Sequence, residues 1–296
     1  IADGVIDGVR VDHPDGLADP AGYLSRLRDA GAGHVWVEKI LHPGEPLRDW
    51  PVDGTVGYEF LVDTTSLFVD GAAEGALTSL YAKVTGEQRA FEEVAHEAQL
   101  EMAGGTFSRE VDWLHRLAPD VDRSEIKTAL AAIPIYRTYV EPWSGKVDQL
   151  DRDALSSMPE RLRRILLLEE RGFDEFVTRF QQTSPPVTAK GIEDTAFYRY
   201  NRLLALNEVG NDPGRFGITV DEYHRLNAAR PPRGLLITST HDTKRSADVR
   251  ARIGAISLFV EEWGELVRSL VPSWPDPNDL WMVLQNVVGA WPLTAD

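Results

Sequence analysis

Three carboxylic acids, Asp12, Glu38 and Asp242, each come at or just past the end of a segment that is typical of a buried β-strand. Where such strands are parallel, their carboxyl ends share one face, and barrel enzymes assemble their active sites there. Two carboxyl groups at one site can act as nucleophile and acid–base, the usual equipment for breaking glycosidic bonds with retention. An ordinary helix N-cap is the alternative interpretation of Asp242.

The neighbours of the first two acids favour different protonation states. Side chains alternate along a strand, so Arg10 and Asp12 point the same way, and a guanidinium there would keep a nucleophilic carboxylate ionised. Glu38 shares a face with Trp36, and partial desolvation by the indole would raise the pKa of Glu38, as a general acid needs. The alternatives are a loop-capping role for Asp12 and, for Glu38, a salt bridge with Lys39 or a plain surface position.

The elements around these acids predict parallel pairing. Strands are expected at residues 5–11 and 34–38. Between them Asp19 can cap a helix, Pro20 suits its first turn, and Gly31 supplies its end. A strand–helix–strand unit of this kind joins parallel strands through a crossover helix.

The rest of the chain predicts one interruption of that architecture. Apolar residues recur at helical spacing through the middle of the sequence, and strand signals return at 187–190 and 235–239. We therefore expect an α/β fold with two barrel segments, 1–65 and 186–296, separated by a mainly helical insertion at 66–185. Four parallel strands suit part of a (β/α)8 TIM barrel better than a complete one.

Composition excludes several classes of function. The 296 residues carry a formal net charge of −16, which repels phosphate backbones and disfavours nucleic acid as a partner. The absence of cysteine excludes disulfides and thiolate chemistry. No metal-ligand spacing, phosphate-binding loop, membrane-length apolar run or leader is evident, so we expect no cofactor, no metal, no membrane partner and a cytoplasmic location. Both ends are expected to continue into missing N- and C-terminal parts of the same enzyme.

Three motifs resemble conserved regions of the α-amylase superfamily, glycoside hydrolase family 13. They are Gly-Val-Arg-Val-Asp-His at 8–13, Val-Glu-Lys-Ile at 37–40 and Ser-Thr-His-Asp at 239–242. The resemblance implies a nucleophile at Asp12, an acid–base at Glu38 and a third acid at Asp242. It also implies supporting roles for two neighbours, Arg10 and His241.

Longer motifs resemble the maltooligosyltrehalose synthase subfamily. They cover His13-Pro14-Asp15-Gly16 and its continuation to Pro20, the run from Ala189 to Tyr200, and His241-Asp242-Thr243-Lys244-Arg245-Ser246. The resemblance places the chain at about strands 4 to 7 of the barrel. It implies further substrate-binding residues: His13, Lys190, Asp194, Tyr198 and Lys244. For each lysine the alternative is an ion pair with a nearby acid, and for Asp194 it is a helix cap.

Two positions depart from the superfamily pattern. The Asn usual before the His-Asp pair is Thr240, and the His usual four residues after the nucleophile is Gly16. Both departures fit the subfamily. The superfamily's first conserved region is absent from the sequence and is expected upstream of Ile1.

The implied activity is an intramolecular transglycosylation, catalysed by a (1→4)-α-D-glucan 1-α-D-glucosylmutase. It would convert the reducing-end α-1,4 linkage of a maltooligosaccharide into an α,α-1,1 linkage by retaining double displacement, giving maltooligosyltrehalose. The alternatives are an α-glucan hydrolase, in which water is the acceptor, and a glycan-binding chain without activity of its own.

Overall fold

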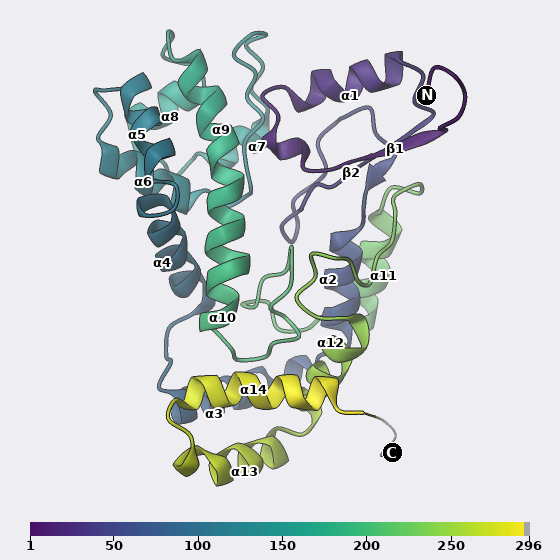
Figure 1. Ribbon diagram of the computed structural model, residues 1–296, viewed down its shortest axis with the longest axis vertical. Helices are drawn as coiled ribbons and strands as arrows, with labels where there is room; N and C mark the ends of the chain where they lie inside the picture. The colour runs from purple at the N-terminus through teal and green to yellow at the C-terminus, as the bar shows by residue number, and fades with distance from the viewer. Residues whose placement is uncertain (293–296) are drawn as a thin grey trace. The chain divides into compact units, whose positions relative to one another are not determined.

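The computed structural model describes residues 1–292, which form two compact units (Figure 1). Unit 1 comprises Ile1–Val56 and Ala95–Thr195, and unit 2 comprises Gly57–Val94 and the chain from Ala196 onward. Within the described residues, no helix is long and apolar enough to cross a membrane. The predicted division of the chain into two barrel segments, 1–65 and 186–296, and a helical insertion at 66–185 stays a prediction.

Unit 1 contains a small parallel sheet with strand order β1-β2-β3. The strands are β1 (Gly8–Val11), β2 (His34–Val37) and β3 (Gly54–Thr55). Helix α1 (Pro20–Asp29) connects β1 to β2, so the expected strand–helix–strand unit is confirmed. Asp19 caps α1 by accepting a hydrogen bond from the Gly22 amide at 2.8 Å, also as expected.

The two faces of this sheet have different side chains. Val35 and Val37 are fully buried in a core cluster with Leu24 of α1, which explains why α1 packs on this face. Arg10 of β1 and Trp36 of β2 are register partners and belong to the opposite face. The register therefore brings the carboxyl ends of β1 and β2 side by side.

The remaining helices of unit 1 surround a second apolar cluster, which includes Val111, Leu130, Ile165 and Phe180. They are α4 (Phe91–Gly104, whose first residues fall in unit 2), α5 (Ser108–Leu117), α6 (Arg123–Ala132), α7 (Gln149–Ala154), α8 (Glu160–Leu166) and α9 (Asp174–Thr188). The mainly helical character expected of the middle of the chain is confirmed.

The strand expected at 187–190 is wrong. These residues end α9 and begin a π-helical stretch, η3 (Ala189–Ala196). Pro185 and Pro186 lie inside α9, although proline removes an amide donor and usually ends a helix. Val187 and the preceding turns of α9 are buried in the helical cluster, and this packing outweighs the local signal.

In the residues that the structure describes, all regular elements of unit 2 are helical. Its elements are α2 (Tyr58–Leu67), η2 (Gly71–Ala73), α3 (Glu74–Thr85), α10 (Phe197–Arg199), α11 (Val220–Ala229), α12 (Ala247–Gly254), η4 (Ala255–Leu258), α13 (Val260–Leu270), η5 (Val271–Ser273) and α14 (Pro277–Ala290). Helices α3, α13 and α14 pack together, with Trp281 edge-on to Trp263 at 5.4 Å and to Tyr81 at 5.4 Å (Figure 1).

The strand expected at 235–239 is also wrong. The segment runs without regular secondary structure, and Leu236 is 61% exposed. A strand needs a neighbour for its amides and carbonyls, and the described part of unit 2 contains no strand. Of the four expected strands, the structure therefore confirms the first two and adds β3, which the sequence pattern did not predict.

Candidate active site

The first two predicted acids lie together at the carboxyl edge of the sheet. Asp12 follows β1 directly, and Glu38 follows β2. The Glu38 amide donates to the Val11 carbonyl at 2.8 Å, which extends the pairing of the two strands by one residue. The backbone alone therefore fixes the two carboxyl groups next to each other.

One guanidinium connects the two carboxyl groups. Arg10 Nη1 donates to Asp12 Oδ1 at 2.9 Å, and Arg10 Nη2 donates to Glu38 Oε1 at 3.1 Å. The second Glu38 oxygen, Oε2, accepts from the backbone amide of His13 at 3.2 Å. Glu38 pairs with Arg10, whereas Lys39 has other partners, so the alternative of a Glu38–Lys39 bridge is wrong.

Burial differs between the two acids. The Glu38 side chain is 13% exposed and that of Asp12 is 67% exposed. Burial raises the pKa of Glu38, and the hydrogen bond with Asp12 raises it further, while the His13 amide and the Arg10 charge lower it. The net shift is upward, which favours a protonated Glu38 beside its more exposed partner. This is the division expected of an acid–base and a nucleophile.

A buried ionic cluster that the sequence analysis missed supports these loops. Lys39 is fully buried, with Nζ 3.1 Å from Glu45 Oε1 and 3.7 Å from Asp15 Oδ2. The Tyr139 hydroxyl donates to Asp15, and burial raises the pKa of Tyr139 well above its ordinary value, so it remains a donor. Arg137 donates to the Asp15 carbonyl at 2.6 Å. The sequence signals were Asp15, within the motif that follows Asp12, and Lys39, within the motif at 37–40.

The position of the His13 imidazole explains why residue 16 is a glycine. His13 has φ 43°, in the left-handed region, and its residue precedes the short helix η1 (Pro14–Gly16). A Cβ added at Gly16 would lie 2.7 Å from His13 Cδ2. A side chain at position 16 and the present His13 ring position are therefore incompatible.

Two predicted sugar-binding residues lie on the π-helical stretch of unit 1. Lys190 Nζ is 2.5 Å from Asp194 Oδ2, an i,i+4 pair, with side chains 56% and 41% exposed. The ion-pair alternative for Lys190 is therefore present, and Asp194 lies inside η3 instead of capping a helix. Gly191 faces Gln99 of α4 so closely that a Cβ would lie 2.7 Å from Gln99 Cα.

The remaining predicted residues lie in unit 2. Asp242 Oδ2 is 3.2 Å from His241 Nε2, and the Asp242 amide donates to Thr240 Oγ1 at 3.2 Å. Thr240 Oγ1 is also 3.0 Å from the Tyr58 hydroxyl, which gives the Thr at this position a structural role. Tyr198 is 50% exposed in the same unit.

A buried acid holds the loop that follows Asp242, and the sequence analysis missed it. Glu208 is fully buried and accepts from the amides of Lys244 at 2.8 Å and Arg245 at 3.2 Å. It also pairs with Arg250 Nη1 at 3.2 Å. The backbone at Lys244 is thereby fixed. No pattern around Glu208 distinguished it from a surface acid.

The predicted residues thus fall into three groups within the two units. Arg10, Asp12, His13 and Glu38 form one contiguous group in unit 1, and Lys190 pairs with Asp194 elsewhere in that unit. Asp242, His241, Lys244 and Tyr198 belong to unit 2. Their convergence on one substrate is part of the proposal below.

No family profile matches the sequence. Two proteins from Mycobacterium tuberculosis strains, both named "Putative maltooligosyl trehalose synthase", are 36% identical over an alignment that spans 313 positions and covers 99% of this chain and 41% of each relative. The solved maltooligosyltrehalose synthase from Arthrobacter ramosus is similar with a TM-score of 0.88 and 36% identity, over 99% of this chain and 41% of that chain. A hypothetical maltooligosyl trehalose synthase from Sulfolobus tokodaii gives a TM-score of 0.88 at 33% identity, over 98% of this chain and 40% of that one.

The chain spans about 41% of the length of the curated relatives it matches. Along nearly all of its own length, it is homologous to the maltooligosyltrehalose synthases.

Proposed function

We propose that the chain carries the nucleophile and the acid–base of a retaining intramolecular transglycosylase, a (1→4)-α-D-glucan 1-α-D-glucosylmutase. The observation that supports this most directly is the Arg10 guanidinium shared by Asp12 and Glu38, beside a Glu38 whose pKa is raised. In this proposal β1, α1, β2 and β3 belong to a (β/α)8 barrel of glycoside hydrolase family 13, and the helices of unit 1 form most of an insertion.

In the first step, an Asp12 carboxylate oxygen attacks the anomeric carbon of the penultimate sugar, counted from the reducing end. The glycosidic C–O bond breaks, and Glu38 gives its proton to the departing oxygen of the terminal glucose. The result is a covalent glycosyl ester on Asp12 and an ionised Glu38. Arg10 steadies the carboxylate at the start and the ionised Glu38 at the end, since it contacts both.

In the second step, the freed glucose turns within the site. Its anomeric hydroxyl gives a proton to Glu38 and attacks the glycosyl ester, so the bond to Asp12 breaks and an α,α-1,1 linkage forms. Two displacements at the same carbon retain its configuration. A retained acceptor can have an effective concentration of about 10⁵ M or more when it is well oriented, which favours it over water.

The other predicted residues would hold the sugars. Asp242 would act as the third acid with His241 beside it, while His13, Tyr198 and Lys244 would contact hydroxyl groups. Lys190 and Asp194 would do the same, because an ion pair between two such exposed side chains is worth only about 0–1 kcal/mol and gives way easily to a ligand. Three donors on an ammonium can serve several hydroxyls at once.

The test is to incubate a full-length protein that contains this chain with maltopentaose, and to follow reducing sugar and product mass together. The proposal expects reducing sugar to fall at unchanged mass. Rising reducing sugar with shorter products as the main outcome would show a hydrolase instead. Asp12→Asn should abolish turnover, because an amide cannot form the glycosyl ester; near-normal activity would remove Asp12 as the nucleophile.

A further inference from the structure

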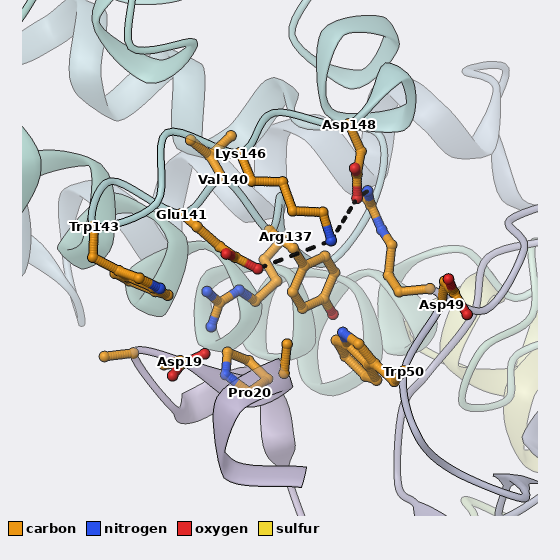
Figure 2. A pocket seen from close by; sticks show the side chains of 14 residues that line it. Asp19, Pro20, Asp49, Trp50, Arg137, Val140, Glu141, Trp143, Lys146 and Asp148 are labelled. Carbon is orange, nitrogen blue, oxygen red and sulfur yellow. Dashed lines mark ion pairs between the residues drawn. The ribbon is translucent and has the colours of Figure 1, made fainter. Parts of the chain in front are cut away.

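A hollow in unit 1, away from Arg10, Asp12 and Glu38, has no role in the reaction above. Its walls come from the start of α1, the loop after β2 and the segment between α6 and α7 (Figure 2). Its lining includes Asp19, Trp50, Arg137, Glu141, Trp143 and Lys146. The turn at 141–146 is closed by backbone pairing of Glu141 with Lys146, so Trp143 is presented on a defined hairpin.

The charges of the hollow disfavour an ion as its ligand. Three cationic and four acidic residues line it. Lys146 lies 4.0 Å from Glu141 and 3.7 Å from Asp148, as the dashed lines in Figure 2 mark. Arg48 pairs with Asp151 at 2.9 Å, and Arg137 donates to backbone carbonyls. Because Lys146 and Arg48 have carboxylate partners and the lining carries both donors and acceptors, a neutral ligand rich in hydroxyl groups fits this lining.

The exposed indole of Trp143 and the largely buried indole of Trp50 both line the same hollow. Trp143 is 53% exposed, and Figure 2 shows Trp143 and Trp50 on opposite sides, with Pro20 between them on the α1 wall. Trp50 is held edge-on against Tyr139 at 5.0 Å. An exposed indole on a fixed turn beside matched polar groups is an amphipathic surface, and the ligand that it fits has both C–H faces and hydroxyl edges. Sugar rings have this combination.

We propose that this hollow is a second α-glucan-binding site, separate from the carboxyl pair, which holds a distal stretch of the same polymer or a second chain. The choice of α-glucan among sugars rests on the proposed function. Arg137 links the hollow to the segment that follows Asp12. It donates hydrogen bonds to the carbonyls of Asp15 and Leu17, which lie between Asp12 and Asp19 in the sequence.

The test is calorimetric titration of the chain with cyclomaltoheptaose, a cyclic α-1,4-glucan that has no reducing end to present to Asp12. Trp143→Ala should weaken this binding about tenfold or more, the loss of one central aromatic contact. Trp274→Ala is the matched control, since Trp274 is a comparably exposed indole, 41%, in unit 2. It should leave the affinity unchanged, and both variants should keep the unaltered circular dichroism spectrum.

Equal affinity of the unaltered chain and Trp143→Ala would overturn the proposal, and so would the absence of any binding by the unaltered chain. Tighter binding of a negatively charged sulfated sugar than of the neutral ring would overturn the ligand class. The result is separable from the proposed function, because turnover of maltopentaose is measured independently. Binding that depends on Trp143 in a protein without mutase activity would leave the second site standing and remove only the mechanism.

Discussion

At the scale of single residues, the site depends on how Arg10 is shared. The guanidinium has a fixed fork of donors, so it can contact Asp12 and Glu38 at the same time, 2.9 Å from one and 3.1 Å from the other. A shared cation also resists the rise in the Glu38 pKa that burial causes. Arg10 therefore holds the two carboxyl groups together and limits the rise in the Glu38 pKa.

Replacing Arg10 by Met should lower kcat/KM by about 10²-fold or more, since proton transfer by Glu38 loses its alignment. It should also move the basic limb of the pH profile of kcat/KM to higher pH. The sign follows because the Arg10 charge lowers the Glu38 pKa, so without it Glu38 stays protonated to higher pH. Arg225→Met, at an arginine that is 74% exposed, is the control. A basic limb that stays in place would contradict the acid–base role of Glu38.

Replacing Gly16 by Ala should displace the His13 ring, because the new Cβ would lie 2.7 Å from His13 Cδ2. The ring is exposed and can swing away, so we expect a loss of kcat/KM with a stability cost below about 1 kcal/mol. In a His13→Ala background the same change should have little further effect, since there is no ring left to displace. A double-mutant cycle measures this, and additive losses would contradict the coupling.

At the scale of elements, the junction of α9 and η3 positions Lys190 and Asp194. Two prolines inside α9 remove amide donors from its last turns, and the chain then continues as a π-helical stretch. In a π-helix the hydrogen-bond spacing widens, and such stretches are frequent at functional sites. Close contact of Gly191 with Gln99 of α4 fixes where this stretch lies within unit 1.

Gly191→Ala should therefore destabilise the chain by about 1–3 kcal/mol, the usual cost of overpacking a close contact. The contacted atoms include Gln99 Cα at 2.7 Å and Gln99 N at 2.9 Å, which are backbone atoms that cannot simply rotate away. Urea unfolding measures the change. Gly75→Ala is the control, because Gly75 lies in α3 with nothing within 4 Å of the added Cβ and should be neutral or slightly stabilising. Equal stability of the two variants would contradict this prediction, because it would show that α4 and η3 can move apart at Gly191 without cost.

At the scale of the whole molecule, the described sheet has three strands in the order β1-β2-β3, so β1 and β3 are its edges. A closed barrel has no edges, and open edges lower stability and invite association. The chain also covers only about 41% of the relatives that it matches. We therefore expect the proposed reaction to need further parts of the protein beyond these 296 residues.

The chain by itself should accordingly bind α-glucan without turning it over. Supplying the remaining N- and C-terminal parts of a maltooligosyltrehalose synthase as further chains should restore the fall in reducing sugar. Loss of reducing ends from maltopentaose is the measurement, with Asp12→Asn in the reconstituted mixture as the control. Robust turnover by the purified chain alone would refute the requirement.

The sequence by itself determined the features that depend on local spacing. Alternation along β1 places Arg10 two residues before Asp12 on one face, and the Asp19 cap with its following Pro20 starts α1. Motifs around Asp12, Glu38 and Asp242 were enough to indicate the homologous family, because chemistry constrains neighbouring residues along the chain. None of these inferences required knowledge of distant contacts.

Tertiary structure alone decided the features that depend on distant partners. Val187 is helical because its side chain is buried among helices far away in sequence, whereas its local pattern after two prolines predicted a strand. The segment at 235–239 has strand-like residues but no neighbouring strand in the described part of its unit. Lys39 and Glu208 gain their roles only from groups that the fold brings against them, Asp15 and the backbone amide of Lys244 among them. Packing and buried charge pairing depend on which groups lie close together in the fold. The spacing of residues along the sequence does not specify which distant segments become neighbours.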